Sequence, residues 1–150
     1  MQGYKEIIQY AIESEIAAEK FYKEISAKVS KPLLKEIFSD FAKEENKHHQ
    51  LLRGVQDNKE AELHFKTGND YGISQTVEMP TKISDEMTLA EVFAIAMKNE
   101  EDAMKMYKSL ASDSSSADIK KLFEDLAAME KGHKVKMEEL YTDVAYAESW

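Results

Sequence analysis

Apolar residues recur at steps of three and four along four stretches of the chain, residues 4–29, 34–55, 89–110 and 119–144. This spacing places them on one face of an α-helix, and the alternation of the two steps is typical of the seam between packed helices. The sequence has only five glycines and two prolines, which also favours helix. The pattern therefore predicts an all-α fold built from four long helices.

The first and third connections between these stretches are short. "VSKP", residues 29–32, carries its proline where the first turn of a helix tolerates one. "TLAE", residues 88–91, has the pattern of a capping box that opens the third helix. "ASDSSSAD", residues 111–118, separates the last two stretches and offers Ser115 or Ser116 as an N-cap. Because short connections join antiparallel neighbours, each pair of stretches is predicted to form a helix hairpin.

The second connection is much longer than a hairpin requires. Glycines and a proline break the periodicity over residues 57–87, although "NKEAELHF" at 58–65 could add a turn of helix. A crossover along the length of the bundle would leave the second and third long helices parallel. We therefore expect one domain over residues 1–150, with hairpins at 4–56 and 88–146 joined by this crossover.

The two predicted hairpins are copies of one unit. When the sequence is shifted by 85 positions, residues 11–48 align without a gap on residues 96–133, and 13 of the 38 positions are identical. Shared alanines, lysines and phenylalanines could reflect the composition of any bundle. Two glutamates, a tyrosine and a histidine that match in the same register are harder to attribute to composition.

Polar residues interrupt the apolar stripe of each helix near its middle. The interrupting residues are four glutamates and two histidines: Glu15, Glu45, His48, Glu100, Glu130 and His133. In each hairpin the first glutamate precedes a Glu-x-x-His by 30 residues, so all four carboxylates should meet at one level of the bundle. One Glu-x-x-His is common in charged helices, but two in this arrangement form a strong signal.

Four buried carboxylates need compensating positive charge. An unpaired carboxylate in an apolar core is costly or takes up a proton, and four together repel one another. The stripes contain no Lys or Arg, whereas two divalent cations would balance the carboxylates and leave two neutral imidazoles as nitrogen ligands. Glu and His three residues apart on a helix can share one metal ion. This donor set favours iron or manganese over structural zinc, and it matches the pattern of di-iron carboxylate bundles.

With these motifs the chain resembles the ferritin-like di-iron carboxylate superfamily, and it is most similar to rubrerythrin-related proteins that lack a rubredoxin domain. The resemblance implies a ferritin-like four-helix bundle of two antiparallel helix hairpins joined by a long crossover. It also implies two iron ions per chain, with manganese or zinc as substitutes in the isolated protein. The implied ligands are terminal carboxylates from Glu15 and Glu100, bridging carboxylates from Glu45 and Glu130, and one histidine per iron from His48 and His133.

Tyr22 and Tyr107 match tyrosines that, in this family, follow the first glutamate of each hairpin by seven residues and lie close to the metals. We treat them as candidate catalytic residues that orient a ligand carboxylate through a hydrogen bond. The alternative is that both simply fill the helix seam.

Other positions depart from the family pattern or from the repeat. Rubrerythrins proper carry a cysteine-rich electron-transfer module, and this chain has no Cys. Met97 stands where those proteins have an additional carboxylate ligand. Glu19 and His49 have no counterpart of the same type in the second hairpin, and we expect both to face solvent.

The implied function is an oxidoreductase in which two iron(II) ions deliver two electrons to peroxide or dioxygen. A separate protein would have to supply the electrons. One alternative is iron handling, as a ferroxidase or storage protein without catalytic turnover. Another is a bundle that serves only protein contacts, which would leave its buried carboxylates uncompensated.

Charge and composition limit the partners. The formal net charge is −9, with 29 acidic and 20 basic residues, so nucleic acids and anionic membranes are poor partners. The N-terminus has no apolar stretch typical of a signal peptide or membrane span. The absence of Cys gives no support for secretion, and we expect a cytoplasmic protein. A homodimer is compatible with the family resemblance.

Overall fold

The computed structural model describes residues 3–66, 83–84 and 86–145, with side chains described as far as residue 142. Its helices are α1 (Tyr4–Lys28), α2 (Pro32–Gln56), α3 (Lys59–Leu63), α4 (Leu89–Ser112) and α5 (Ala117–Ala145). The four long helices confirm the all-α bundle, and α3 confirms the extra turn after the second of them. Most of the predicted crossover lies outside the described residues. Within the described part of the chain, no helix is both long and apolar enough to cross a membrane.

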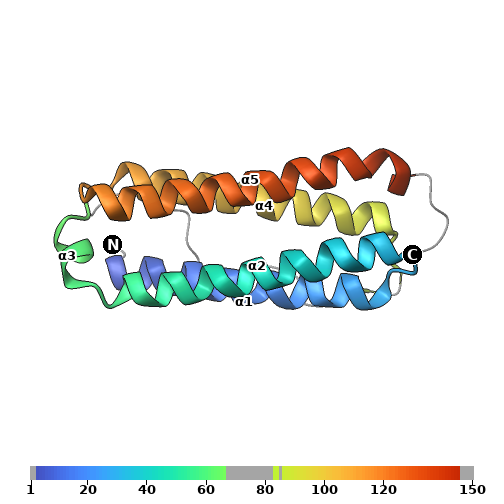
Figure 1. Ribbon diagram of the computed structural model, residues 1–150, viewed down its shortest axis with the longest axis horizontal. Helices are drawn as coiled ribbons and strands as arrows, with labels where there is room; N and C mark the ends of the chain where they lie inside the picture. The colour runs from blue at the N-terminus through green and yellow to red at the C-terminus, as the bar shows by residue number, and fades with distance from the viewer. Residues whose placement is uncertain (1–2, 67–82, 85, 146–150) are drawn as a thin grey trace.

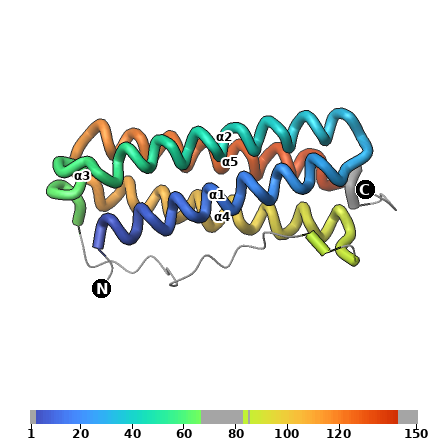
Figure 2. Tube along the Cα trace, turned by 90° about the horizontal axis from the view of Figure 1, so that it is seen from below, coloured from blue at the N-terminus to red at the C-terminus, as the bar shows by residue number. Residues whose placement is uncertain are grey.

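The long helices form two closely packed pairs, α1 with α2 and α4 with α5 (Figure 1). Helices α2 and α4 start at the same end of the bundle and run in the same direction, as the long connection predicts (Figure 2). Helix α3 lies at the opposite end. There Phe65 and Ser114 form an isolated antiparallel bridge, and the backbone N–H of Lys66 donates to the carbonyl of Asp113 at 2.8 Å. These bonds tie the first hairpin to the turn of the second.

Local sequence signals mark the starts of the helices. Pro32 lies in the first turn of α2, as expected. Thr88 is the N-cap of α4, and its hydroxyl oxygen accepts a hydrogen bond from the backbone N–H of Glu91 at 3.1 Å. The Thr88 hydroxyl also donates to the Glu91 carboxylate at 3.2 Å. Helix α5 begins at Ala117, directly after the predicted cap Ser116.

Buried apolar residues form two clusters along the bundle axis. One includes Ile8 of α1, Leu52 of α2, Leu110 of α4 and Phe123 of α5. The other includes Ile25 of α1, Phe38 of α2, Phe93 of α4 and Met137 of α5. In each long helix, the polar residues of the stripe lie between the residues that belong to the two clusters. Hydrophobic burial on both sides therefore holds these polar residues at one level.

We predict that Leu52→Ala lowers the free energy of unfolding by about 2–5 kcal/mol, because it removes buried methyl groups and leaves a cavity. Leu52 is fully buried, whereas its neighbour Leu51 is 49% exposed. Leu51→Ala is the matched control and should change stability by no more than about 0.5 kcal/mol. Urea unfolding followed by circular dichroism measures both values. Equal losses in the two variants would contradict the helix register.

Candidate metal centre

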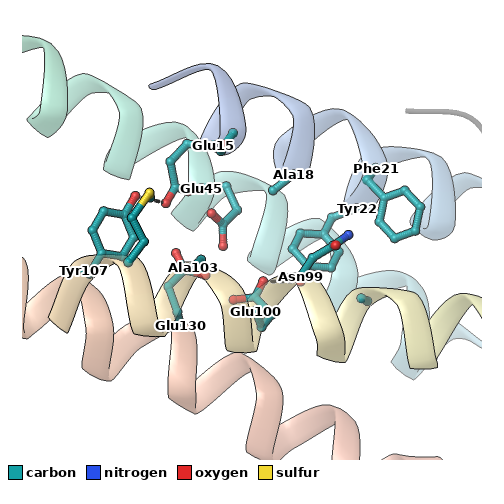
Figure 3. Close-up of a pocket in the computed structure, with 13 residues that line it drawn as sticks. Glu15, Ala18, Phe21, Tyr22, Glu45, Asn99, Glu100, Ala103, Tyr107 and Glu130 are labelled. Carbon is teal, nitrogen blue, oxygen red and sulfur yellow. Dashed lines mark hydrogen bonds between the residues drawn. The ribbon is translucent and has the colours of Figure 1, made fainter. Parts of the chain in front are cut away.

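The four long helices bring the six polar stripe residues together inside the bundle. Helix α1 contributes Glu15, α2 contributes Glu45 and His48, α4 contributes Glu100, and α5 contributes Glu130 and His133. None of the six is more than 4% exposed. Figure 3 shows the four carboxylates pointing toward one another across the interior. The burial of all six rules out a set of solvated helix-surface residues.

The donor atoms of these residues fall into two overlapping groups. One group is Glu15, Glu45, His48 and Glu130, and the other is Glu45, Glu100, Glu130 and His133. Within each group, one donor atom per residue lies within 4.8 Å of the others. Glu45 and Glu130 belong to both groups. The geometry therefore provides two adjacent cation positions, each with its own glutamate and histidine, and two carboxylates between them.

Both histidines turn Nδ1 toward the carboxylates. His48 Nδ1 lies 3.0 Å from Glu130, and His133 Nδ1 lies 3.0 Å from Glu45. Each ring also faces the unshared glutamate of its own hairpin, at 3.5 Å and 3.6 Å respectively. Each histidine thus contacts a shared carboxylate that comes from the opposite hairpin.

Two tyrosines link the hairpins at the edges of this cluster (Figure 3). Tyr22 of α1 donates a hydrogen bond to Glu100 of α4, and Tyr107 of α4 donates one to Glu15 of α1. Burial, reinforced by nearby carboxylates, raises the pKa of both phenols well above its usual value. Each hydroxyl therefore keeps its proton and acts as a donor. The expected bonds are present, while a catalytic role for either tyrosine stays a prediction.

In the metal-free protein, protons compensate part of the buried charge. Burial, with the charges of Glu100 and Glu45, raises the pKa of Glu130 well above its usual value and favours the protonated acid. Burial alone would also raise the pKa of Glu45, but the adjacent imidazoles of His133 and His48 outweigh it and lower that pKa. Burial alone would lower the pKa of His133, but the adjacent carboxylates of Glu100 and Glu45 raise it to about 11. His133 is therefore a cation at neutral pH.

The chemistry of the donor set fits a pair of metal ions. One buried carboxylate oxygen of each of Glu15, Glu45 and Glu100 has no hydrogen-bond partner among the described residues. No lysine or arginine is among the described residues that line the space between the carboxylates. Such buried, unsatisfied oxygens are rare in proteins unless something binds them. Carboxylate oxygens combined with imidazole nitrogens suit divalent iron and manganese.

The space between the carboxylates is small and reaches between α1 and α4 (Figure 3). Its volume is about 20 Å³, room for a molecule about the size of water. Ala18 and Ala103, which the repeat relates to each other, line it on the two helices. The cluster therefore encloses little free space.

Residues around the cluster differ partly from expectation. Met97 packs against an apolar cluster, so α4 offers no further carboxylate there. The expectation that Glu19 and His49 face solvent is wrong, because both side chains are only 13% exposed and lie 3.7 Å apart. Asn46 donates to Glu19 at 3.1 Å, and these three residues form a separate polar contact between α1 and α2. This contact was missed because periodicity marks buried apolar faces and not polar pairs between neighbouring helices.

Glu44 is a further contact of the cluster that the sequence does not reveal. Its carboxylate accepts a hydrogen bond from Nε2 of His133, although the Glu44 side chain is 42% exposed. Glu44 lies outside the apolar stripe of α2. Helical periodicity therefore gives no reason to single it out among the many charged residues of that helix.

We predict that metal binding at neutral pH releases protons, because cations replace those held by Glu130 and His133. Up to about two protons per chain should leave, and the apparent affinity should rise about tenfold per pH unit for each. Calorimetric titration with Mn²⁺ in buffers of different ionisation enthalpy measures this number. Binding without proton release, and with an affinity that does not change between pH 6 and 8, would contradict the assigned protonation.

Comparison with known proteins places the chain in a family. The rubrerythrin family model matches residues 6–141. None of the curated proteins compared with the chain shows significant similarity. A Thermotoga maritima protein described as ferritin-like diiron-carboxylate superposes with a TM-score of 0.79, at 23% identity over 95% of this chain and 96% of that one. A hypothetical protein from Pyrococcus furiosus superposes with a TM-score of 0.78, at 27% identity over 99% of this chain and 94% of that one. The family match spans most of the chain and includes all six clustered residues, so the chain belongs to the rubrerythrin family.

Proposed function

We propose that this chain binds two iron ions and uses them to reduce peroxide or dioxygen, with electrons from a separate donor protein. The observation that carries the proposal is the pair of overlapping donor groups that share Glu45 and Glu130. Membership of the rubrerythrin family agrees with a di-metal centre. The sequence contains no Cys, so an internal thiolate-bound electron carrier has no ligands within these 150 residues.

When bound, two iron(II) ions would together supply the two electrons that reduce one hydrogen peroxide, with two protons, to two waters. The protein would fix the geometry. The two shared glutamates would hold the ions close together, while each unshared glutamate and histidine would bind one ion. Tyr22 and Tyr107 would keep the unshared carboxylates in place through their hydrogen bonds.

Little free space lies among the carboxylates, which favours a small oxidant over a bulky organic substrate. Its volume of about 20 Å³ holds a molecule about the size of water. Burial of the six polar residues excludes bulk water from the rest of the site. In such surroundings, electrostatic interactions are stronger than in water.

Iron handling is the second candidate, because a carboxylate-rich pair of positions serves a ferroxidase as well as a peroxidase. The two differ in what remains after oxidation. A peroxidase returns to the reduced state when a donor is added and keeps two ions per chain. A storage protein accumulates oxidised iron in a larger assembly. A cytoplasmic location and a homodimer also stay predictions.

We predict that Glu45→Ala or Glu130→Ala abolishes the binding of two metal ions per chain, because each change removes a donor from both positions. Glu15→Ala should weaken only one position. Glu13→Ala is the control, since Glu13 lies on the exposed face of α1. Equilibrium dialysis with metal analysis gives the stoichiometry. Equal loss in Glu13→Ala would show that the ligands are chosen wrongly.

We predict that the di-iron(II) protein is oxidised by hydrogen peroxide faster than free iron(II) at the same concentration. Stopped-flow absorbance follows the reaction, and the expected stoichiometry is one peroxide for two irons. Adding an electron donor should restore the iron(II) state for further cycles. An oxidation rate equal to that of free iron would refute the oxidoreductase proposal. Large particles holding many irons per chain would support storage instead.

A further inference from the structure

The two histidines of the cluster have different surroundings at the ring nitrogen that points away from the carboxylates. Nε2 of His133 donates a hydrogen bond to the carboxylate of Glu44. Nε2 of His48 is buried and has no hydrogen-bond partner among the described residues. Both rings present Nδ1 to the carboxylates. The difference therefore lies only on the outer side of the rings.

The internal repeat explains where this difference arises. A shift of 85 positions relates Glu44 to Met129, and each of these residues directly precedes a shared glutamate. Met129 is exposed, and the side chain of Glu44 is also partly exposed. The second hairpin thus keeps the backbone position but replaces the carboxylate with a thioether. A thioether is a poor acceptor for an imidazole N–H.

A second contact also holds only one of the rings. Phe41 stacks on His133 with ring centroids 4.2 Å apart and an interplanar angle of 28°. The repeat places Leu126 at the position equivalent to Phe41, and a leucine offers no ring to stack on His48. His133 is therefore fixed by both a hydrogen bond and a stacked ring.

An outer carboxylate affects how well a histidine binds metal. A carboxylate that accepts the outer N–H fixes the tautomer and the orientation of the ring, and it raises the basicity of the ligating nitrogen. Removal of such a partner typically costs about 10–100-fold in metal affinity. A buried N–H without a partner gains none of this support and carries a desolvation cost.

We propose that Glu44 is a positioning residue that makes the two metal positions unequal, so that the position with His133 and Glu100 binds the first ion and the position with His48 and Glu15 binds the second. The inference rests on the proposed di-metal centre and is independent of any peroxide chemistry. If the second position is weaker, its ion should also exchange more readily than the ion at the first position.

The test is a titration of the metal-free protein with Co²⁺, whose absorption spectrum reports each binding step. The unaltered protein should show two steps of different affinity. Glu44→Ala should weaken the tighter step about 10–100-fold and leave the weaker step unchanged. Glu44→Gln keeps an acceptor oxygen and should weaken it less. His133→Ala and His48→Ala identify which step belongs to which position.

Two further variants sharpen the test. Glu36→Ala removes an exposed carboxylate from the same helix and controls for the change in net charge. Met129→Glu places a carboxylate at the position equivalent to Glu44, and it should tighten the weaker step. Circular dichroism of each metal-free variant confirms that the bundle is intact. Because neither Glu44 nor Met129 is buried, neither change should disturb the core.

The outcomes separate this inference from the proposed function. Two steps of equal affinity, or a loss in Glu44→Ala no larger than in Glu36→Ala, would overturn the role of Glu44 and leave the di-metal centre standing. Absence of Co²⁺ binding would overturn both. Two unequal steps that respond to Glu44 in a protein inert to peroxide would support the inference while refuting the oxidoreductase proposal.

Discussion

The structure depends on how four carboxylates are accommodated inside a helical bundle. A buried carboxylate is stable only when a proton, a cation or hydrogen-bond donors compensate its charge. Here the described residues supply two imidazoles and two phenol hydroxyls, but no lysine or arginine lines the space between the carboxylates. The raised pKa of Glu130 and of His133 reflects the same shortage of positive charge. Two divalent cations would satisfy this demand more completely than protons, because their four positive charges equal the charge of four carboxylates.

The bundle and the polar cluster support each other. Apolar clusters on both sides hold the four helices in a register that brings the six polar residues together. The hydrogen bonds of Tyr22 to Glu100 and of Tyr107 to Glu15 then link α1 to α4 through the polar layer. Phe41 joins the two kinds of packing, because it belongs to an apolar cluster and also stacks on His133. Metal binding and core stability are consequently expected to be coupled.

The internal repeat gives a nearly symmetric set of donors, whereas the residues around that set differ between the two hairpins. The glutamates, histidines and tyrosines of the two hairpins match in one register. Their neighbours do not: Glu44 corresponds to Met129, and Phe41 corresponds to Leu126. Residues in direct contact with an ion must satisfy its geometry, while the next layer can vary and adjust affinity. Asymmetry in that outer layer is the basis of the proposal that the two metal positions differ in affinity.

The sequence by itself determined the helices, their pairing and the six polar residues at the centre. Strict helical periodicity exposes any polar residue that replaces a core position, and the repeat independently selects the same residues. Thr88 and Pro32 mark helix starts because capping is local chemistry.

Only the tertiary structure decided the contact of Glu44 with His133 and the pairing of Glu19 with His49. Both contacts join residues on different helices through long, flexible side chains at the edge of the core. Which side chains meet depends on the distance between neighbouring helices and on the rotation of each helix about its axis. The spacing of residues along one helix does not encode either quantity.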